Sequence, residues 1–123
     1  MLFRSGGSTH LLTRGTTRVR AMEMMLLAEK TPAAQAVQWG LINRVVPDDQ
    51  LDSVAMELVA RLAAGPTRSY ALIREAAWRT LDSGWEEALR LERKNQSIAC
   101  ATQDAAEGIA AFVEKRQAQF MGR

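Results

Sequence analysis

The residues of this chain that could do chemistry are few and far apart in the sequence. His10 is the single histidine and Cys100 is the single cysteine. Ser5 lies five residues before His10, so the two could form a nucleophile and its base, but no third residue is placed to orient the imidazole. Serine alone cannot act as a general base near pH 7. We therefore expect no catalytic residue in the chain, and we expect His10 to be a surface or packing residue.

The other candidate patterns can be interpreted as functional sites or as ordinary structural features. Residues 6–9, Gly-Gly-Ser-Thr, could form a phosphate-binding loop or a turn that caps a short helix through Leu12. The further glycine and the lysine of a P-loop are missing, which favours the turn. The histidine, the cysteine and the carboxylates do not have the spacing of metal ligands, so we expect no metal site. Three candidate acids are better explained by exposed helix positions or a cap: Glu23, Glu29 and Glu86.

The composition is that of an ordinary globular chain. With 123 residues it is long enough for one domain with a real core. Hydrophobic residues make up 47% and aromatic residues only 6%, which favours closely packed helices rich in alanine and leucine. The net charge of +2 comes from mixed charges, so we expect no nucleic-acid partner. The lone cysteine excludes an intrachain disulfide and fits a cytoplasmic protein. No apolar run approaches the ~20 residues of a membrane span, and residues 1–4 do not begin a signal peptide, so we expect no membrane partner.

The elements that would position any site are organised around residues 26–51. Thr31 and Pro32 make a helix opening, because the threonine oxygen can accept from free backbone N–H groups and proline at the first helical position sacrifices no hydrogen bond. Gly40 closes that helix, since such an end usually needs a residue in the left-handed conformation. Residues 41–46 are β-prone, and they are the only segment with a strand pattern. Pro47 ends this segment and opens the next helix.

Helical periodicity predicts the segments on either side of this stretch. Residues 17–28 carry apolar side chains that we interpret as core filling rather than as a flexible ligand surface: Val19, Met22, Met25 and Leu26. Residues 51–62 form the clearest amphipathic helix, with one continuous apolar stripe: Leu51, Val54, Ala55, Leu58, Val59 and Leu62. Gly65 and Pro66 end this helix.

Three more helices are predicted downstream. Residues 67–81 follow a helical pattern, and Ser83 with Glu86 forms a capping box for the next helix, with Trp85 anchoring its first turn. Thr102 caps the last helix, whose inward side we expect three apolar residues to form: Ile109, Phe112 and Val113. The sequence therefore predicts an all-α fold, a single domain of residues 1–123 with a bundle of about six helices and one short extended segment.

The same segments resemble a known family. Residues 31–46 are similar to the segment T/S-A-x-E-A-x-x-W/L-G-L-V-N-x-V-V of the enoyl-CoA hydratase/isomerase family, the crotonases. Residues 6–23 resemble the family's D-G-G-x-x-x-L and A-R-A-M-E-L steps, and residues 111–123 resemble its terminal A-F-x-E-K-R-x-P-x-F-x-G-R. Their order and spacing together make the chain similar to the C-terminal part of a crotonase, whose full domain is considerably longer.

The resemblance implies a domain whose reactive groups lie elsewhere. A crotonase is a β–β–α spiral that binds acyl-CoA thioesters in fatty-acid metabolism and holds the thioester oxygen with two backbone N–H groups. Both donors belong to parts of the family domain that this chain lacks. Hydratases of the family use two glutamates, and isomerases can use an aspartate at a P-D-x-G step, where this chain has Arg4 and Ser5. By this resemblance the chain lacks both the oxyanion hole and the acid/base carboxylates.

What the resemblance retains is a surface for coenzyme A (CoA). The family's last helix supplies a phenylalanine and a lysine that approach the adenine and phosphates of CoA, often from a neighbouring subunit, and the matching residues are Phe112 and Lys115. Three residues apart, they lie on adjacent faces of one helix. An aromatic face suits adenine and an ammonium suits phosphate. The plainer alternative is that Phe112 belongs to the core and Lys115 is a solvated charge. Further cations could join a phosphate-facing patch: Arg93, Lys94 and Arg116.

Two hypotheses from different classes follow. The first is a crotonase-family protein reduced to its helical C-terminal part, without hydratase activity, which forms a homo-oligomer to cover apolar surface and which could still bind CoA or acyl-CoA. The second is an active crotonase-type enzyme acting on acyl-CoA thioesters, alone or with a partner that supplies the missing half. A helical interaction module without any ligand is a third, weaker interpretation.

Overall fold

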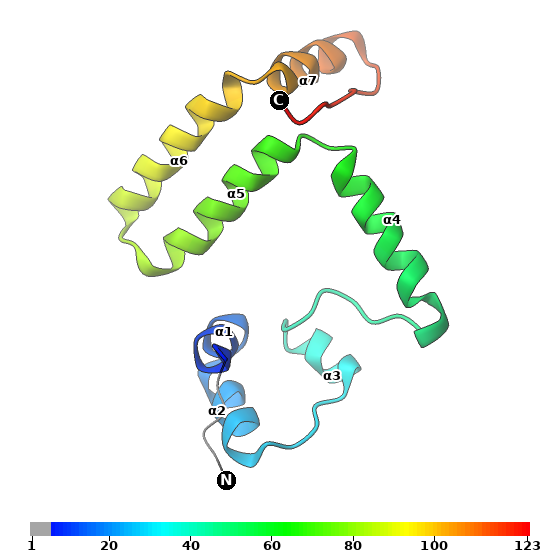
Figure 1. Ribbon diagram of the computed structural model, residues 1–123. Coiled ribbons are helices and arrows are strands. Elements are labelled where there is room, and N and C mark those ends of the chain that lie inside the picture. Colours follow the sequence, from blue (N-terminus) through cyan, green and yellow to red (C-terminus); the bar gives the residue numbers. More distant parts are fainter. Residues whose placement is uncertain (1–5) are drawn as a thin grey trace. The chain divides into compact units, whose positions relative to one another are not determined.

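The computed structural model describes residues 6–123, and throughout that range the regular structure is helical (Figure 1). It consists of seven α-helices, α1 to α7, and two short 3-10 helices, η1 and η2, with no strand between residues 6 and 123. The predicted all-α class is therefore confirmed, with seven α-helices in this range where about six were expected. Contacts divide the chain into two compact units, unit 1 (Met1–Leu51) and unit 2 (Asp52–Arg123), which are described separately. The single domain stays a prediction.

Unit 1 holds three short helices: α1 (Ser8–Gly15), α2 (Arg18–Leu27) and α3 (Ala33–Gln38). Gly7 precedes α1 with φ 98°, a left-handed conformation that glycine adopts at little cost and that fits a turn. No side chain caps α1, however, and the helix runs past the expected Leu12 to Gly15. Thr17 caps α2, because its Oγ1 accepts a hydrogen bond from the Arg20 N–H at 3.4 Å. The Arg20 guanidinium lies 5.1 Å from the centre of the Trp39 ring, which links α2 to the end of α3 by a cation–π contact.

Helix α3 ends as predicted but begins differently. Gly40 has φ 76°, and the Leu41 N–H donates to the Ala36 carbonyl at 2.9 Å, which is the expected glycine-terminated end. At the other end Pro32 is the N-cap residue, and no side chain accepts from the free N–H groups. The predicted Thr31 cap is therefore wrong, because Thr31 lies one residue too far upstream.

The predicted strand at residues 41–46 is not formed in the described part of the chain. These residues are bends followed by an extended stretch that leads to η1 (Asp48–Gln50). A β-prone segment forms a strand only beside another strand, and residues 6–123 offer it none.

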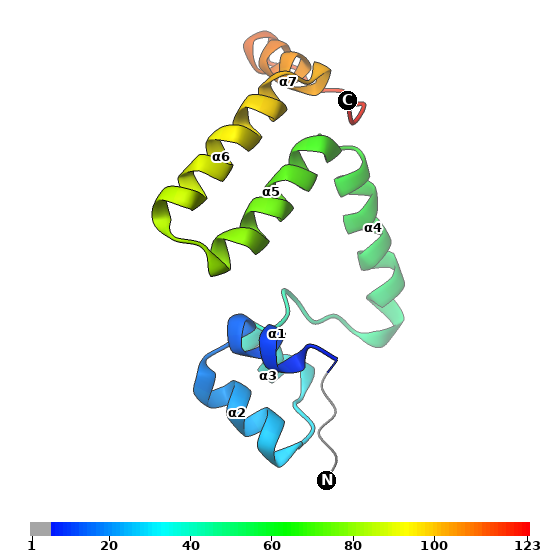
Figure 2. The same cartoon turned by 60° about the vertical axis from the view of Figure 1, so that its left-hand side comes forward.

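Unit 2 is built around a helical hairpin. Helix α4 (Leu51–Ala63) begins at the boundary between the units, and three α-helices and η2 follow: α5 (Thr67–Arg79), η2 (Thr80–Asp82), α6 (Trp85–Cys100) and α7 (Gln103–Glu114). Helices α5 and α6 run antiparallel and lie side by side in both views (Figures 1 and 2). Asn95 Nδ2 of α6 donates to the Leu72 carbonyl of α5 at 3.0 Å, and both residues are buried. This hydrogen bond ties the middle of the hairpin together.

The start of α6 differs from the prediction. Gly84 is its N-cap residue and supplies no side-chain cap, and the buried Ser83 Oγ has no hydrogen-bond partner. The predicted Ser83–Glu86 capping box is wrong, because Ser83 lies one residue before the N-cap. Trp85 is 76% exposed, so it does not anchor the first turn.

The buried residues are few. Within residues 6–123 the buried apolar residues are Ala21, Leu72 and Ala111, and the buried polar residues are Asn95 and Asp104. None of these helices has the length and apolar character needed to cross a membrane.

Two predicted inward faces are therefore wrong. In α2 only Ala21 is buried and Met25 is half-buried, while the other predicted core residues are exposed: Val19, Met22 and Leu26. In α7 Ala111 is buried and the predicted inward residues are all exposed: Ile109, Phe112 and Val113. The apolar stripe of α4 also contains no buried residue. Helical periodicity located the apolar faces of these helices, but within residues 6–123 no other segment buries the large side chains that form them.

The accessible surface is large for the mass of the chain. It measures 10162 Å², whereas a compact monomer of 13.6 kDa exposes about 6,600 Å². Two separate compact bodies of the sizes of units 1 and 2 would together expose about 7,900 Å². The excess of roughly 2,000 Å² therefore arises within the units, and it reflects faces such as the α4 stripe.

Candidate functional site

The candidate site lies at the end of α7, whose two ends are well defined. Thr102 is the predicted cap: its Oγ1 accepts from the Ala105 N–H at 3.1 Å. At the other end Lys115 adopts a left-handed conformation with φ 54° and ψ 38°. The next N–H, that of Arg116, donates back to the Ala111 carbonyl at 3.0 Å. This is the usual geometry of a helix end, but with lysine in the place where glycine is common.

Phe112 and Lys115 are both exposed at this end of α7. Phe112 has 86% of its surface in solvent, the highest value for a large hydrophobic side chain among the described residues. The alternative that Phe112 belongs to the core is therefore wrong for this chain, whereas Lys115 is a solvated charge as that alternative assumed. The backbones of the two residues are joined directly, because the Lys115 N–H donates to the Phe112 carbonyl at 3.3 Å. An aromatic face and an ammonium thus lie free on one short segment.

The chain then turns back along α7, and we call its residues 116–123 the C-terminal strap. Figure 1 shows this segment in red, returning from the end of α7 toward the junction of α6 and α7. Asp104 receives it: the carboxylate accepts from the Met121 N–H at 2.7 Å and from the Gly122 N–H at 2.8 Å. The Asp104 N–H in turn donates to the Arg123 carbonyl at 3.0 Å. Since Asp104 is only 3% exposed, these are hydrogen bonds of a nearly dry carboxylate.

A second carboxylate holds the middle of the C-terminal strap. Glu107 accepts from the Gln119 N–H at 2.8 Å and forms a bidentate ion pair with Arg116, at 2.6 and 2.8 Å. The Arg116 hydrogen bonds, followed by that of Gln119, lower the pKa of the Glu107 carboxyl to about 2. Arg116 also binds Glu114 at 2.5 Å, and these carboxylates raise its pKa. Arg116 is therefore paired with two carboxylates within the chain.

The sequence did not reveal the role of Asp104 and Glu107. Asp104 follows the Thr102 cap by two residues, a position that an acidic first turn explains without any further role. Its partners lie 17 and 18 residues downstream, and those of Glu107 lie up to 12 residues away. The sequence did offer one signal: an acidic first turn, a basic helix end and a glycine near the terminus follow one another. This order suggests that the chain returns along the helix, but only when the end of the helix is already known.

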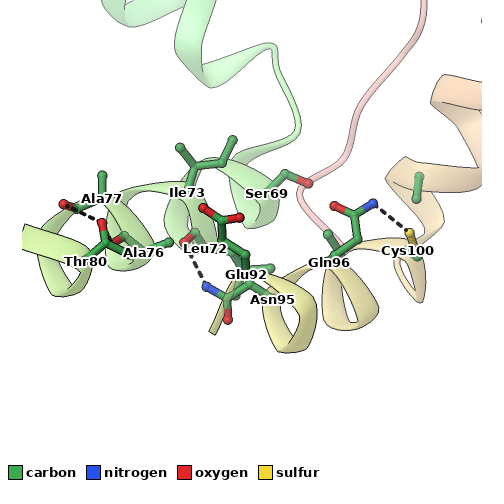
Figure 3. A pocket seen from close by; sticks show the side chains of 12 residues that line it. Ser69, Leu72, Ile73, Ala76, Ala77, Thr80, Glu92, Asn95, Gln96 and Cys100 are labelled. Carbon is green, nitrogen blue, oxygen red and sulfur yellow. Dashed lines mark hydrogen bonds between the residues drawn. The ribbon is translucent and has the colours of Figure 1, made fainter. Parts of the chain in front are cut away.

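A groove of about 590 Å³ lies between α5 and α6 (Figure 3). Its apolar lining comes from both helices and from the start of α7: Leu72, Ile73, Ala76, Ala99 and Ala105. Gln96 Nε2 donates to Cys100 Sγ at 3.3 Å on the α6 side, and Glu92 is the single acid in the lining. One carboxylate without a second acid or a histidine offers apolar contact rather than acid/base chemistry.

The other sequence candidates do not come together into a site. His10 lies exposed on α1, and Arg4 and Ser5 lie outside the described residues, so the Ser5–His10 pair remains untested. Cys100 is free and exposed. Across residues 6–123 no group of three or more His, Cys, Asp or Glu side chains is arranged to hold a metal ion. The exposed end of α7 is therefore the candidate that the geometry favours.

Comparison with known proteins places the chain in a family. The family model described as enoyl-CoA hydratase/isomerase matches residues 2–123. The chain is 39% identical over 117 residues to the 1,2-epoxyphenylacetyl-CoA isomerase of Escherichia coli K12, covering 95% of this chain and 45% of that protein. It is 32% identical to the trans-2-decenoyl-[acyl-carrier-protein] isomerase of Streptococcus mutans, covering 95% and 44% respectively.

Solved structures agree with these relatives. An enoyl-CoA hydratase subunit I from Geobacillus kaustophilus superposes with a TM-score of 0.91 at 38% identity, covering 95% of this chain and 46% of that chain. The enoyl-CoA hydratase of Bacillus anthracis gives a TM-score of 0.89 at 28% identity, with 95% and 45% covered. The chain thus spans somewhat less than half the length of the relatives it matches. It belongs to the enoyl-CoA hydratase/isomerase family, the crotonases.

Proposed function

We propose that this chain is a helical, C-terminal part of a crotonase that binds CoA or an acyl-CoA thioester through α7, self-associates, and has no hydratase activity by itself. The observation that carries the proposal is the exposure of Phe112 next to Lys115. A phenylalanine that is 86% exposed gains nothing from the fold of this chain, whereas an adenine ring stacked on it would cover its face. The Lys115 ammonium, one helical turn further on, suits a phosphate.

The absence of activity follows from the candidate acids. Glu23 in α2, Glu29 after it and Glu86 in the first turn of α6 are all exposed. General acids and bases of this kind of chemistry lie in sites that exclude water, where their proton affinity is tuned and where fixed dipoles stabilise the enolate. We therefore expect the isolated chain to bind the thioester without converting it.

Self-association is supported by the uncovered surface. The excess of roughly 2,000 Å² is comparable to the total area of a standard protein–protein interface, 1,200 to 2,000 Å². The exposed large hydrophobic side chains include members of the α4 stripe, and large exposed apolar patches are rare on monomers. A second copy of the chain is the simplest partner, and we propose a homo-oligomer. The cytoplasm and fatty-acid metabolism remain expectations from the sequence and the family.

A second candidate is an active enzyme in which another polypeptide supplies the rest of the family domain. It is favoured by one observation: the chain covers only 45% of the E. coli isomerase to which it is 39% identical. A coupled assay with crotonyl-CoA distinguishes the two candidates. Turnover by the chain alone, or only after a polypeptide equivalent to the missing half is added, would support the enzyme. No turnover in either case would leave the binding proposal.

Titration calorimetry with CoA and acetyl-CoA tests the binding proposal on a sample whose mass in solution is known. We expect saturable binding that Phe112→Ala and Lys115→Ala each weaken at least about ten-fold, the loss of one stacked ring or one charged contact. Lys30→Ala, which removes the same charge from an exposed position outside α7, should leave binding unchanged. Equal binding by all three variants, or none by the wild type, would refute the proposal and favour an interaction module without a ligand.

A further inference from the structure

Lys115 has an unusual backbone conformation. Among the described residues only Ala28 and Lys115 have a positive φ without being glycine. The left-handed conformation brings Cβ too close to the following carbonyl oxygen, so a lysine remains there only if its surroundings hold it. On one side Lys115 is held by the end of α7. On the other side the chain continues into the C-terminal strap, whose first residue, Arg116, donates its N–H to the Ala111 carbonyl.

Two carboxylates fix that strap. Glu107 accepts from the Gln119 N–H and Asp104 from the Met121 and Gly122 N–H groups, all at 2.7 to 2.8 Å. All three donors belong to the backbone, so the contacts determine the path of the chain rather than the identity of the side chains. The lowered pKa of Glu107 agrees with a carboxylate that is stabilised in its charged form first by the Arg116 guanidinium and then by the Gln119 N–H.

Gly122 closes the C-terminal strap against α5. Its φ is 75°, and a Cβ placed on it would lie 2.6 Å from Thr67 Oγ1 at the start of α5. Phe120 lies against Gly108 of α7, where a Cβ would meet its ring at 3.5 Å. The strap is therefore a fitted element that passes from the end of α7 to the start of α5.

We propose that Asp104 and Glu107 are positioning residues for the CoA site: by receiving the backbone of the C-terminal strap, they keep Lys115 left-handed and so keep its ammonium where a phosphate of CoA meets it. This inference rests on the proposed function, and it assigns to the strap a role beyond stability. If the strap is released, Lys115 relaxes to an ordinary conformation. Binding then requires the left-handed conformation to be restored, so the apparent affinity falls by the fraction of chains that retain it.

The test compares two carboxylates that share one arginine. Glu107→Gln weakens both the ion pair and the Gln119 contact, whereas Glu114→Gln removes the same charge from the same helix and the same Arg116 without touching the strap backbone. Calorimetry with CoA should show binding about 5- to 30-fold weaker for Glu107→Gln and unchanged for Glu114→Gln. Hydrogen exchange at the Gln119, Met121 and Gly122 amides reports independently whether the strap has been released.

A double-mutant cycle separates positioning from stability. If Glu107 acts through Lys115, then Glu107→Gln has no further effect on CoA binding once Lys115→Ala is present. Gly122→Ala is the second variant: it strains the strap through its φ and Thr67 without changing any charge, and it should weaken binding as Glu107→Gln does. Circular dichroism identifies any variant that has unfolded, and the other variant then decides.

The outcomes of this test are distinguishable from those of the proposed function. A wild type that does not bind CoA overturns the proposed function and this inference together. A wild type that binds CoA, with variants whose strap amides exchange freely but whose affinity is unchanged, overturns the positioning role alone. Additive losses in the double-mutant cycle would do the same.

Discussion

The apolar stripe of α4 provides the sharpest prediction, because it is continuous and no part of it is buried. Replacing Val59 and Leu62 by serine removes two of its side chains, which are 54% and 48% exposed. Burying such a side chain fully is worth about 1.5 to 3 kcal/mol, so covering the exposed half contributes about 0.7 to 1.5 kcal/mol each. In a twofold dimer each substitution counts twice, so the pair contributes about 3 to 6 kcal/mol. The dissociation constant should therefore rise at least about a hundred-fold.

Sedimentation velocity over a range of concentrations measures this change. The control is Glu57→Ser with Arg61→Ser, which places the same two serines off the stripe of the same helix and leaves the net charge unchanged. It lowers helix propensity at least as much, because Glu and Arg form helices better than Ser whereas Val is about equal to Ser. The control should nevertheless associate as the wild type does, since the stripe is intact. The reasoning is refuted if the two double variants associate equally, or if the wild type is a monomer at every concentration.

Three further predictions concern individual contacts. Thr102→Ala removes the cap of α7 and should lower the free energy of unfolding by about 1 kcal/mol in denaturant titrations, whereas Thr9→Ala, which removes an exposed threonine from α1 that caps nothing, should have less effect. Asn95→Ala leaves the buried Leu72 carbonyl without its 3.0 Å donor and should lower the free energy of unfolding by about 1 to 3 kcal/mol in the same measurement. A loss well below about 1 kcal/mol would mean that water replaces the amide as the donor. The pKa of Glu107 is lowered from 4.5 to about 2 on folding, so its stabilising effect is fully present above pH 4.5 and is lost as the pH falls toward 2. The difference in Tm between wild type and Glu107→Gln should therefore shrink over that interval, and a difference that stays constant would contradict the assignment.

The sequence predicted the positions of the helices better than the contacts that the helices make. Periodicity and end residues located the helices, and caps that depend on neighbouring residues, such as Thr102, were predicted correctly. Where one residue decides the register of a cap, the prediction failed at Thr31 and Ser83. At both helix starts, neighbouring residues are nearly equally suited to the N-cap position. Pro32 and Gly84 occupy it, one residue after Thr31 and Ser83.

Burial was beyond the reach of periodicity. A periodic pattern identifies an apolar face, but only tertiary structure decides whether another element covers it. The large apolar residues of α7 (Ile109, Phe112 and Val113) are exposed, whereas the small Ala111 is buried. At the site, Phe112 and Lys115 came from the family resemblance, and the structure places both at one exposed helix end. The hydrogen bond between Asp104 and the Met121 N–H requires the chain to reverse its direction, and no local sequence pattern predicts that reversal.

Among residues 6–123 the buried apolar residues are only Ala21, Leu72 and Ala111, so the proposed self-association would make concentration a folding variable for this chain. Little apolar area leaves water when a single copy folds, so its heat-capacity change and its denaturant sensitivity are small and its melting is gradual. In the proposed homo-oligomer, further apolar area would leave water on assembly. Dilution should then act as a mild denaturant, and a melting temperature has meaning only beside the protomer concentration at which it was recorded.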